Sequence, residues 1–380
     1  MARDFRKFTK RVFIICNFVI VTFFLLACAN AFLHPNEWWF FALLGLAFPF
    51  LLAAVTAFFF FWLIFKSKWA LVSLAALLLG YYYIRALIGF HFSGNFEHAK
   101  KEGTVRILTW NVSWFDEQKK EKKGDRAKRN EMLAFIKQQD ADLLCFQEYL
   151  EFNARKNFYS NVKDLAQLGY PYHFFVNDYT PKDKSFSAGV AVFSRFPIVD
   201  SIRIRYIASD SLHSSESLIA TDINIEGKLI RVFNTHLQSV LLQKKDYRSL
   251  QIIRNAEDSM VEASRSIVKK LKIAYAFRAD QVDIVRKELD NSPYPEIICG
   301  DFSDVPNSYT YFRIKGNRND AFVERSGGLG RTFSNVSSTL RIDYIMTDKQ
   351  LKVLQYKRFL IPYSDHYPIV ADIQLNDTAR

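Results

Sequence analysis

Cysteine is scarce in this chain, which has four in 380 residues, and no two of them form a CxxC pair. Cys16 and Cys28 lie in the first apolar run, whereas Cys145 and Cys299 lie in short strand-like runs. Isolated thiols in apolar sequence usually behave as small buried side chains. The spacing therefore argues against a disulfide framework and against a zinc site.

The chain also lacks the short motifs of several enzyme classes, since it has no GxxxxGK[ST] loop, no GxSxG and no HExxH. The glycine-rich stretch 327–330 lacks the strand-to-helix context of a phosphate cradle, so we expect a flexible turn there. His213, Ser214 and Ser215 lie together but without the sharp turn that exposes a serine nucleophile. These absences count against nucleotide-binding P-loop proteins, serine hydrolases and HExxH metalloproteases.

Three apolar runs dominate the first ninety residues, where charge is rare. They cover residues 12–33, 38–65 and 69–88, and each reaches the roughly 20 residues that cross a hydrocarbon core of about 30 Å. Tryptophan and tyrosine lie near the ends of the runs, as they do at membrane interfaces. We therefore expect a membrane anchor with three transmembrane helices over residues 1–94 and a second domain over residues 95–380.

The first run has an alternative interpretation as a cleaved signal peptide. Five basic residues precede it, and Ala29-Asn30-Ala31 resembles a cleavage site. The two later runs predict an integral, multi-pass membrane protein in either case.

The positions of the cations predict the orientation, because Lys and Arg in short loops stay on the cytoplasmic side. The amino terminus is basic, and the hinge between the second and third runs carries Lys66 and Lys68. The second domain is then expected outside the cytoplasm, on the periplasmic side of the inner membrane if the source is Gram-negative. Lys100 and Lys101 argue mildly against this orientation.

The net charge of +12 falls once the apolar part is set aside. Residues 1–94 hold 8 Lys and Arg against 2 Asp and Glu, which leaves 43 against 37 and a net charge of +6. Residues 241–291 predict one or two amphipathic helices with a basic polar side. Such a surface suits phosphate-bearing substrates or lipid headgroups, although a solvated basic face is the commoner explanation.

From about residue 96 the chain alternates strand-like runs, helical stretches and polar loops without a repeat, which indicates one domain. A helix is expected over residues 130–139. Strands are expected at residues 105–110, 142–147, 189–193, 218–225, 229–234, 296–299, 341–346 and 369–373.

Polar side chains follow or border six of these apolar runs. The groups are Trp110-Asn111, Gln147-Glu148, Thr235-His236, Asp301 with its neighbours up to Asp304, Arg341-Ile342-Asp343 and Ser364-Asp365-His366. Any one of them alone could be a turn or a capped strand end. A sheet that aligns the runs would gather all six at one edge, which predicts a catalytic site there.

These motifs, together with 193–198 and 234–237, resemble those of the endonuclease/exonuclease/phosphatase superfamily, in order and spacing, over roughly residues 104–375. The superfamily includes deoxyribonuclease I, exonuclease III-type enzymes, neutral sphingomyelinases and inositol-polyphosphate 5-phosphatases. The resemblance implies an α+β fold, a deoxyribonuclease I-like four-layer α/β/β/α sandwich. It also implies metal-assisted hydrolysis of phosphate esters.

The resemblance further assigns roles to single residues. Glu148 is the best ligand candidate for Mg²⁺ or Mn²⁺, followed by Asp365 and Asn111, because hard cations prefer oxygen ligands. By resemblance Asp301 orients or deprotonates the attacking water.

The two histidines and one arginine are expected at the phosphate. His366 is expected to pair with Asp343 and to hold its imidazole against a phosphate oxygen, because a carboxylate partner favours the charged ring. His236 resembles the second family histidine, near the phosphate and the leaving oxygen. Arg195 could add a charge to the phosphate clamp, although an arginine at a strand end is as often a surface residue.

Ser303 is where this chain departs from the family pattern, which usually has Asn at that position. A hydroxyl reaches less far than an amide, so Ser303 is expected to contact the phosphate or the water less well. An active but slowed enzyme is the resulting expectation.

The leading hypothesis is a membrane-anchored, metal-dependent phosphodiesterase with nuclease-like activity on nucleic acid. The alternatives are a phospholipid or inositol-phosphate phosphoesterase, and a catalytically weakened binding module of the same fold. The expected partners are the phosphate-ester substrate and the lipid bilayer, and the sequence indicates no protein partner.

Overall fold

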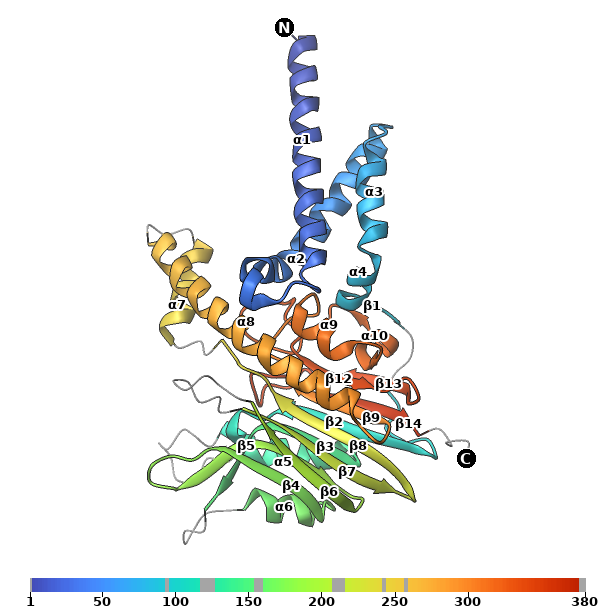
Figure 1. Ribbon diagram of the computed structural model, residues 1–380, viewed down its shortest axis with the longest axis vertical. Coiled ribbons are helices and arrows are strands. Elements are labelled where there is room, and N and C mark those ends of the chain that lie inside the picture. Colours follow the sequence, from blue (N-terminus) through green and yellow to red (C-terminus); the bar gives the residue numbers. More distant parts are fainter. Residues whose placement is uncertain are drawn as a thin grey trace. The chain divides into compact units, whose positions relative to one another are not determined.

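Figure 1 shows a computed structural model of the chain, which describes residues 2–92, 96–116, 127–153, 160–206, 216–240, 244–255 and 259–375. The chain forms two compact units. The first contains Met1–Ile88, Val240–Ala279 and Val305–Arg313. The second contains Gly89–Ser239, Asp280–Asp304 and Ile314–Arg380.

Four helices open the first unit: α1 (Ala2–Ala29), α2 (Pro35–Ile64), α3 (Ala70–Leu79) and α4 (Tyr81–Leu87). Within the described ranges, α1 and α2 are each long and apolar enough to cross a membrane. Helices α3 and α4 reach that length only as a pair, and they meet at a bend of 65°. The two long helices agree with the first two expected spans, and the third expected span is a bent pair. Gly80 lies at the bend, where a Cβ would come within 2.5 Å of the Phe24 ring of α1.

Buried amide side chains attach residues 305–313 to α1 within the first unit. Asn307 Nδ2 donates to the carbonyl oxygen of Ala27, and Asn30 Nδ2 donates to the carbonyl oxygen of Asn307, both at 3.0 Å. A buried amide that loses its partner costs about 1–3 kcal/mol. These bonds therefore fix the segment that follows Asp304 against the end of an apolar helix.

The helical region expected over residues 241–291 is confirmed as α7 (Lys244–Asn255) and α8 (Met260–Asp290). Lys270 Nζ pairs with the buried carboxylate of Asp246 at 2.6 Å, and Lys272 lies 5.1 Å from the ring centre of Trp39. At these two positions the basic side chains make contacts inside the unit rather than facing solvent alone.

The second unit is built on two six-stranded sheets (Figure 1). The first has the order β13 (Lys352–Arg358), β14 (Ile369–Gln374), β2 (Thr104–Asn111), β3 (Leu143–Phe152), β5 (Phe186–Ser194) and β4 (Tyr172–Tyr179). The second has the order β10 (Asn319–Asp320), β12 (Asp343–Thr347), β9 (Glu296–Asp301), β8 (Lys228–His236), β7 (Ser217–Ile225) and β6 (Ile198–Arg205). Every strand expected from the sequence is present.

Shorter elements complete this unit. They are β1 (Gly89–Phe90), which pairs with β11 (Gly327–Gly328), the 3₁₀ helix Ser113–Asp116, and the helices α5 (Ala127–Gln139), α6 (Asn161–Gln167) and α10 (Ala321–Arg325). Helix α9 (Tyr309–Lys315) crosses the boundary between the units. The stretch 327–330, expected as a flexible turn, thus begins as a strand.

Alternation along the strands explains the core, because successive side chains of a strand point to opposite faces. On β2, Ile107 joins the cluster that also holds Val232 of the opposite sheet. Its neighbours Leu108 and Trp110 join a second cluster that includes Met132 of α5. Two apolar layers result, one between the sheets and one under the outer helices. The four-layer α/β/β/α sandwich expected from the sequence is confirmed.

A buried ion pair links the two sheets. Asp178 of β4 accepts hydrogen bonds from Arg203 Nη2 of β6 at 2.9 Å and from Ser217 Oγ of β7 at 2.5 Å. Burial raises the pKa of Asp178 from its usual 3.8 to about 6, although Ser217 and Arg203 oppose that shift. The folded state therefore holds this proton more tightly than the unfolded chain does.

The raised pKa predicts a stability that depends on pH. Asp178 should contribute stability below about pH 4 and lose that contribution as the pH rises through about 6. Relative to Asp178→Asn, which does not titrate, the wild-type free energy of unfolding should fall by up to about 3 kcal/mol between pH 4 and pH 7. Thermal unfolding of both full-length proteins across this range measures the difference. A difference that grows in favour of the wild type as the pH rises would contradict the prediction.

Candidate active site

The polar strand ends expected to form a site come from both sheets. Asp301 ends β9, pairing in register with His236 at the end of β8 and with Asp343 at the start of β12. Asn111 ends β2 and pairs with Gln147, so Glu148 follows at the same level of the first sheet.

The carboxylate of Asp301 is the point where the side chains meet. Its Oδ2 accepts a hydrogen bond from Asn111 Nδ2 at 3.1 Å, and it lies 3.6 Å from both His236 Nε2 and His366 Nε2. Its Oδ1 accepts from the backbone N–H of Ser303 at 2.7 Å. Asp301 is only 2% exposed. One buried carboxylate oxygen thus faces an amide and two imidazoles.

The imidazole of His366 is held from behind by a carboxylate. Its Nδ1 lies 3.0 Å from both carboxylate oxygens of Asp343. Burial opposes its protonation, but Asp343 and Asp301 outweigh burial and raise the pKa of His366 to about 10. The ring is therefore an imidazolium at neutral pH, with Nε2–H directed toward Asp301.

A buried indole fixes the backbone of this histidine. Trp110 Nε1 donates to the carbonyl oxygen of His366 at 2.9 Å. From the sequence Trp110 was expected only as the neighbour of Asn111, and its support of His366 depends on the fold.

His236 has a more mixed environment. Burial opposes protonation of its ring, but the carboxylates of Asp301, Glu148 and Glu216 outweigh that effect and raise the pKa of His236. Nearby carboxylates therefore favour the protonated form of both imidazoles beside Asp301, which suits a site that binds an anion.

Glu148 occupies a strained backbone position in β3. Its φ is +49°, in the left-handed region that non-glycine residues rarely adopt, and the pairing of β3 with β5 is irregular between Phe146 and Tyr149. Bulges of this kind often re-aim a side chain beside an active site. The Oε1 atom of Glu148 accepts from Asn111 Nδ2 at 3.1 Å. Asn111 thereby connects Glu148 with Asp301.

A buried amide pair supports this part of the first sheet. Gln147 Nε2 donates to Asn234 Oδ1 of β8 at 2.6 Å, and Asn234 Nδ2 donates to the carbonyl oxygens of Phe146 and Ala191 at 2.9 Å. Gln147 belongs to one of the six expected polar groups, whereas Asn234 was not expected at the site, although it lies two positions before His236. They join the two sheets beneath Glu148 and His236.

Contacts of the adjacent residue Ser364 place Asp365 near the strand end that carries Asn111. Ser364 Oγ donates to the carbonyl oxygen of Asn111 at 2.8 Å. Asp365 and Ser364 line a cavity of about 430 Å³ that Ser113 and Lys128 also border. The structure thus brings Asp365 to the strand end that carries Asn111.

The donor set decides where a divalent metal ion fits. Asp301, Asp343 and His366 offer one ligand atom each within 4.8 Å of one another. In that cluster Nδ1 of His366 already lies 3.0 Å from both carboxylate oxygens of Asp343. Glu148 is half-buried, and its carboxylate is an oxygen donor of the kind that Mg²⁺ and Mn²⁺ prefer. Asn111 can add an amide oxygen, and Asp365 can add a second carboxylate. These oxygen donors fit such an ion.

Arg195 is the one predicted site residue that the structure does not bring to this group. β5 runs antiparallel to β3, with Ser194 opposite Leu143 at the far end of that strand from Glu148. Arg195 Nη1 instead pairs with Asp140 at 2.6 Å. The expectation of a phosphate clamp is corrected here, because strand direction carries this side chain away.

Known proteins share the sequence pattern and the fold of this chain. The sequence profile of the Endonuclease/Exonuclease/phosphatase family matches residues 108–366. The chain belongs to this family. Residues 10–87 match a separate family described as a domain of unknown function. No curated protein matches the chain.

Solved structures share the family fold at low identity. An endonuclease/exonuclease/phosphatase from Beutenbergia cavernae is 19% identical, with a TM-score of 0.53 over 72% of each chain. The human Nocturnin catalytic domain with bound sulfate is 20% identical, with a TM-score of 0.51 over 73% of this chain and 97% of the other. At such identities the likeness concerns the fold.

Ser303, where this family member departs from the usual Asn, has a left-handed backbone with φ +52°. Its N–H caps Asp301, and its Oγ lies 3.3 Å from the same Asp301 oxygen. Asn is one of the few side chains that tolerate this backbone conformation. The position therefore remains compatible with the family residue.

Ser303→Asn should raise the turnover number, by up to about a hundredfold, because an amide both donates and accepts hydrogen bonds and reaches farther than a hydroxyl. Steady-state kinetics of the full-length protein on the substrate found active measure this effect. Ser303→Ala is the matched control and should show no gain. A rate for Ser303→Asn equal to or below that of the wild type would contradict the prediction.

Proposed function

We propose that this family member is a metal-dependent phosphoester hydrolase that cleaves phosphodiester bonds by in-line attack of water. The observation that carries the proposal is Asp301 Oδ2, a buried carboxylate oxygen placed 3.6 Å from each of two imidazoles. A general base beside two imidazoles whose protonation is favoured is an arrangement suited to the hydrolysis of an anionic ester.

The roles follow from the atoms. Asp301 Oδ2 would accept the proton of the attacking water. His366, fixed by Asp343, would donate from Nε2 to a phosphoryl oxygen and offset its developing charge. His236 would act on the opposite side of Asp301, near the leaving oxygen. Asn111 and the Ser303 N–H hold Asp301 in place.

Glu148, with Asp365 and Asn111, would hold the divalent cation. A bound Mg²⁺ or Mn²⁺ supplies a Lewis acid that neutralises charge on the phosphate.

Nucleic acid is the first candidate for the substrate. A phospholipid or inositol phosphate is the second, favoured by the apolar helices of the first unit, which would keep the site near lipid headgroups. A weakened binding module remains the alternative from another class, supported by Ser303 alone.

A substrate panel tests these candidates. Full-length protein in neutral detergent is incubated with Mg²⁺ or Mn²⁺ and with DNA, RNA, phospholipid vesicles or inositol phosphates, with and without EDTA. Metal-dependent cleavage of one class supports the hydrolase, and binding to nucleic acid that weakens steeply with salt supports the nuclease. Absence of cleavage across the panel would favour the binding module.

We also propose that residues 1–94 anchor the protein in a membrane and that residues 95–380 form the catalytic domain outside the cytoplasm. The support is the apolar length of α1 and α2 and the basic hinge at Lys66 and Lys68. Protease accessibility in intact and permeabilised cells decides the orientation.

A further inference from the structure

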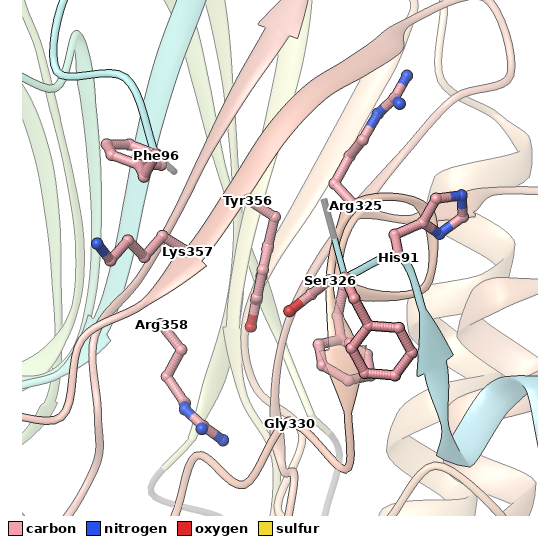
Figure 2. A pocket seen from close by; sticks show the side chains of 11 residues that line it. His91, Phe96, Arg325, Ser326, Gly330, Tyr356, Lys357 and Arg358 are labelled. Atoms are coloured by element: carbon pink, nitrogen blue, oxygen red, sulfur yellow. The ribbon is translucent and has the colours of Figure 1, made fainter. Parts of the chain in front are cut away.

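A further pocket lies in the second unit, apart from the candidate active-site residues. It has a volume of about 310 Å³, and its lining includes His91, Arg325, Ser326, Tyr356, Lys357 and Arg358 (Figure 2). We call it the edge pocket, because β13 is the edge strand of the first sheet. Its described lining contains three Lys or Arg side chains and no acidic side chain.

Two polar groups of the edge pocket lack partners within the part of the chain that the structure describes. The Tyr356 hydroxyl is buried without a hydrogen bond, on a side chain only 8% exposed. The Nε of Arg358 is likewise buried without an acceptor, although its Nη1 donates to the carbonyl oxygen of Arg331. Figure 2 shows the Tyr356 hydroxyl pointing between Ser326 and Arg358. Unpaired buried groups of this kind are costly unless a ligand binds them.

The surroundings of Arg358 favour an anion. Burial lowers the pKa of Arg358, and the nearby cation Arg331 lowers it further. Lys357 lies on the other side of the strand, 5.9 Å from the ring centre of Phe96. A tetrahedral oxyanion offers several acceptor oxygens, which an arginine and two hydroxyls can bind together.

Glycine shapes one wall of the edge pocket. A Cβ at Gly330, where φ is +66°, would lie 2.4 Å from the Phe322 ring, and one at Gly327 would lie 2.4 Å from the Phe92 ring. Larger residues would therefore push aromatic rings out of place. The glycine-rich stretch 327–330, which has no part in the proposed hydrolysis, gains a role here as a pocket wall.

The position of the edge pocket in the chain indicates the source of the anion. His91 and Phe92 follow Leu87, the last residue of α4, by four and five residues. Four residues of extended chain span at most about 14 Å. If α3 and α4 end in a membrane, this short tether keeps His91 near the headgroup layer.

We propose that the edge pocket binds the phosphate of an anionic phospholipid headgroup. Arg358 and the hydroxyls of Tyr356 and Ser326 contact the phosphate oxygens, and Lys357 adds charge at the rim. Phe92 and Phe96 border the pocket, where aromatic rings suit the interfacial region of a lipid. This site is separate from hydrolysis at Asp301, so its test does not depend on finding the substrate.

Native mass spectrometry of the full-length protein in neutral detergent tests the proposal. Phosphatidylglycerol is titrated in, with phosphatidylcholine and inorganic phosphate as separate arms. We expect tighter binding of phosphatidylglycerol than of phosphatidylcholine. Arg358→Gln should weaken that binding at least about tenfold, and Tyr356→Phe should weaken it several-fold.

Lys352→Gln is the matched control, because Lys352 is an exposed cation of the same strand outside the edge pocket. It should bind phosphatidylglycerol like the wild type. Tyr356→Phe removes one hydroxyl only, so it keeps the test open if Arg358→Gln fails to fold. If Tyr356→Phe binds phosphatidylglycerol as tightly as the wild type, or if all three variants bind it equally, the proposed binding site is wrong. Saturation by inorganic phosphate without lipid preference would overturn the lipid as its source.

Discussion

Replacing Asp301 with Asn should lower the turnover number by about 10²- to 10⁴-fold, with a much smaller change in KM, because it removes the proposed general base. The substitution is nearly isosteric, and the single amide oxygen can still accept from Ser303 N–H, whereas the amide nitrogen then faces Asn111 Nδ2 and loses that hydrogen bond. The size of the loss alone therefore does not separate proton transfer from a change in the local hydrogen bonds. Steady-state kinetics on the substrate found active measure it.

A pH profile separates a base from a merely structural residue. Loss of the base should remove the acid limb of the activity profile, whereas a misplaced loop would lower the rate at every pH alike. Asp200→Asn is the control, since Asp200 is an exposed aspartate of β6 in the same sheet. Asp301→Asn activity within about tenfold of the wild type, in a folded protein, would show that another group accepts the proton.

The sequence predicted the central strands and the residues at their ends because buried strands carry a strong apolar signal. Residues 297–299 form a short apolar run that stops at Gly300 and Asp301, and β9 ends at Asp301. Strand ends in register then brought His236 and Asp343 to Asp301. The sequence could not specify that one oxygen of Asp301 serves three partners, because that depends on the register of several strands at once.

The longer strands that were not predicted from the sequence lie at sheet edges. β4, β6 and β13 each end one of the two sheets, so each pairs on one side only. β6 is largely half-buried or exposed along its length. A strand with one covered face and one open edge needs few apolar residues, so its pattern resembles a loop.

Two site details depended on backbone geometry that residue types do not encode. Ser303 was considered for its hydroxyl, whereas the structure adds a left-handed backbone whose N–H caps Asp301. Arg195 followed a strand-like run and matched a family marker, but β5 runs against β3 and carries it to the other end. Chain direction in a sheet follows from long-range pairing, which local sequence leaves open.

Glu148→Gln should raise the concentration of Mg²⁺ or Mn²⁺ needed for half-maximal activity by about a hundredfold or more. A neutral amide binds a hard divalent cation far more weakly than a carboxylate does, and even indirect partners of a metal ligand matter 10- to 100-fold. The amide oxygen can still accept from Asn111 Nδ2, as Glu148 Oε1 does at 3.1 Å. The change thus removes charge while keeping the local hydrogen bond.

Calorimetric titration of Mn²⁺ into the full-length protein supplies a second readout that does not depend on turnover. Wild-type protein should bind the ion, and Glu148→Gln should lose most of that affinity. Glu226→Gln is the matched control, because Glu226 also has a positive φ, of 52°, but lies exposed in the turn between β7 and β8. Equal Mn²⁺ affinity in the wild type and Glu148→Gln would assign the ion to other residues. In that case loss of binding on Asp365→Asn would identify Asp365 as the principal ligand, and the strained backbone at Glu148 would need another explanation.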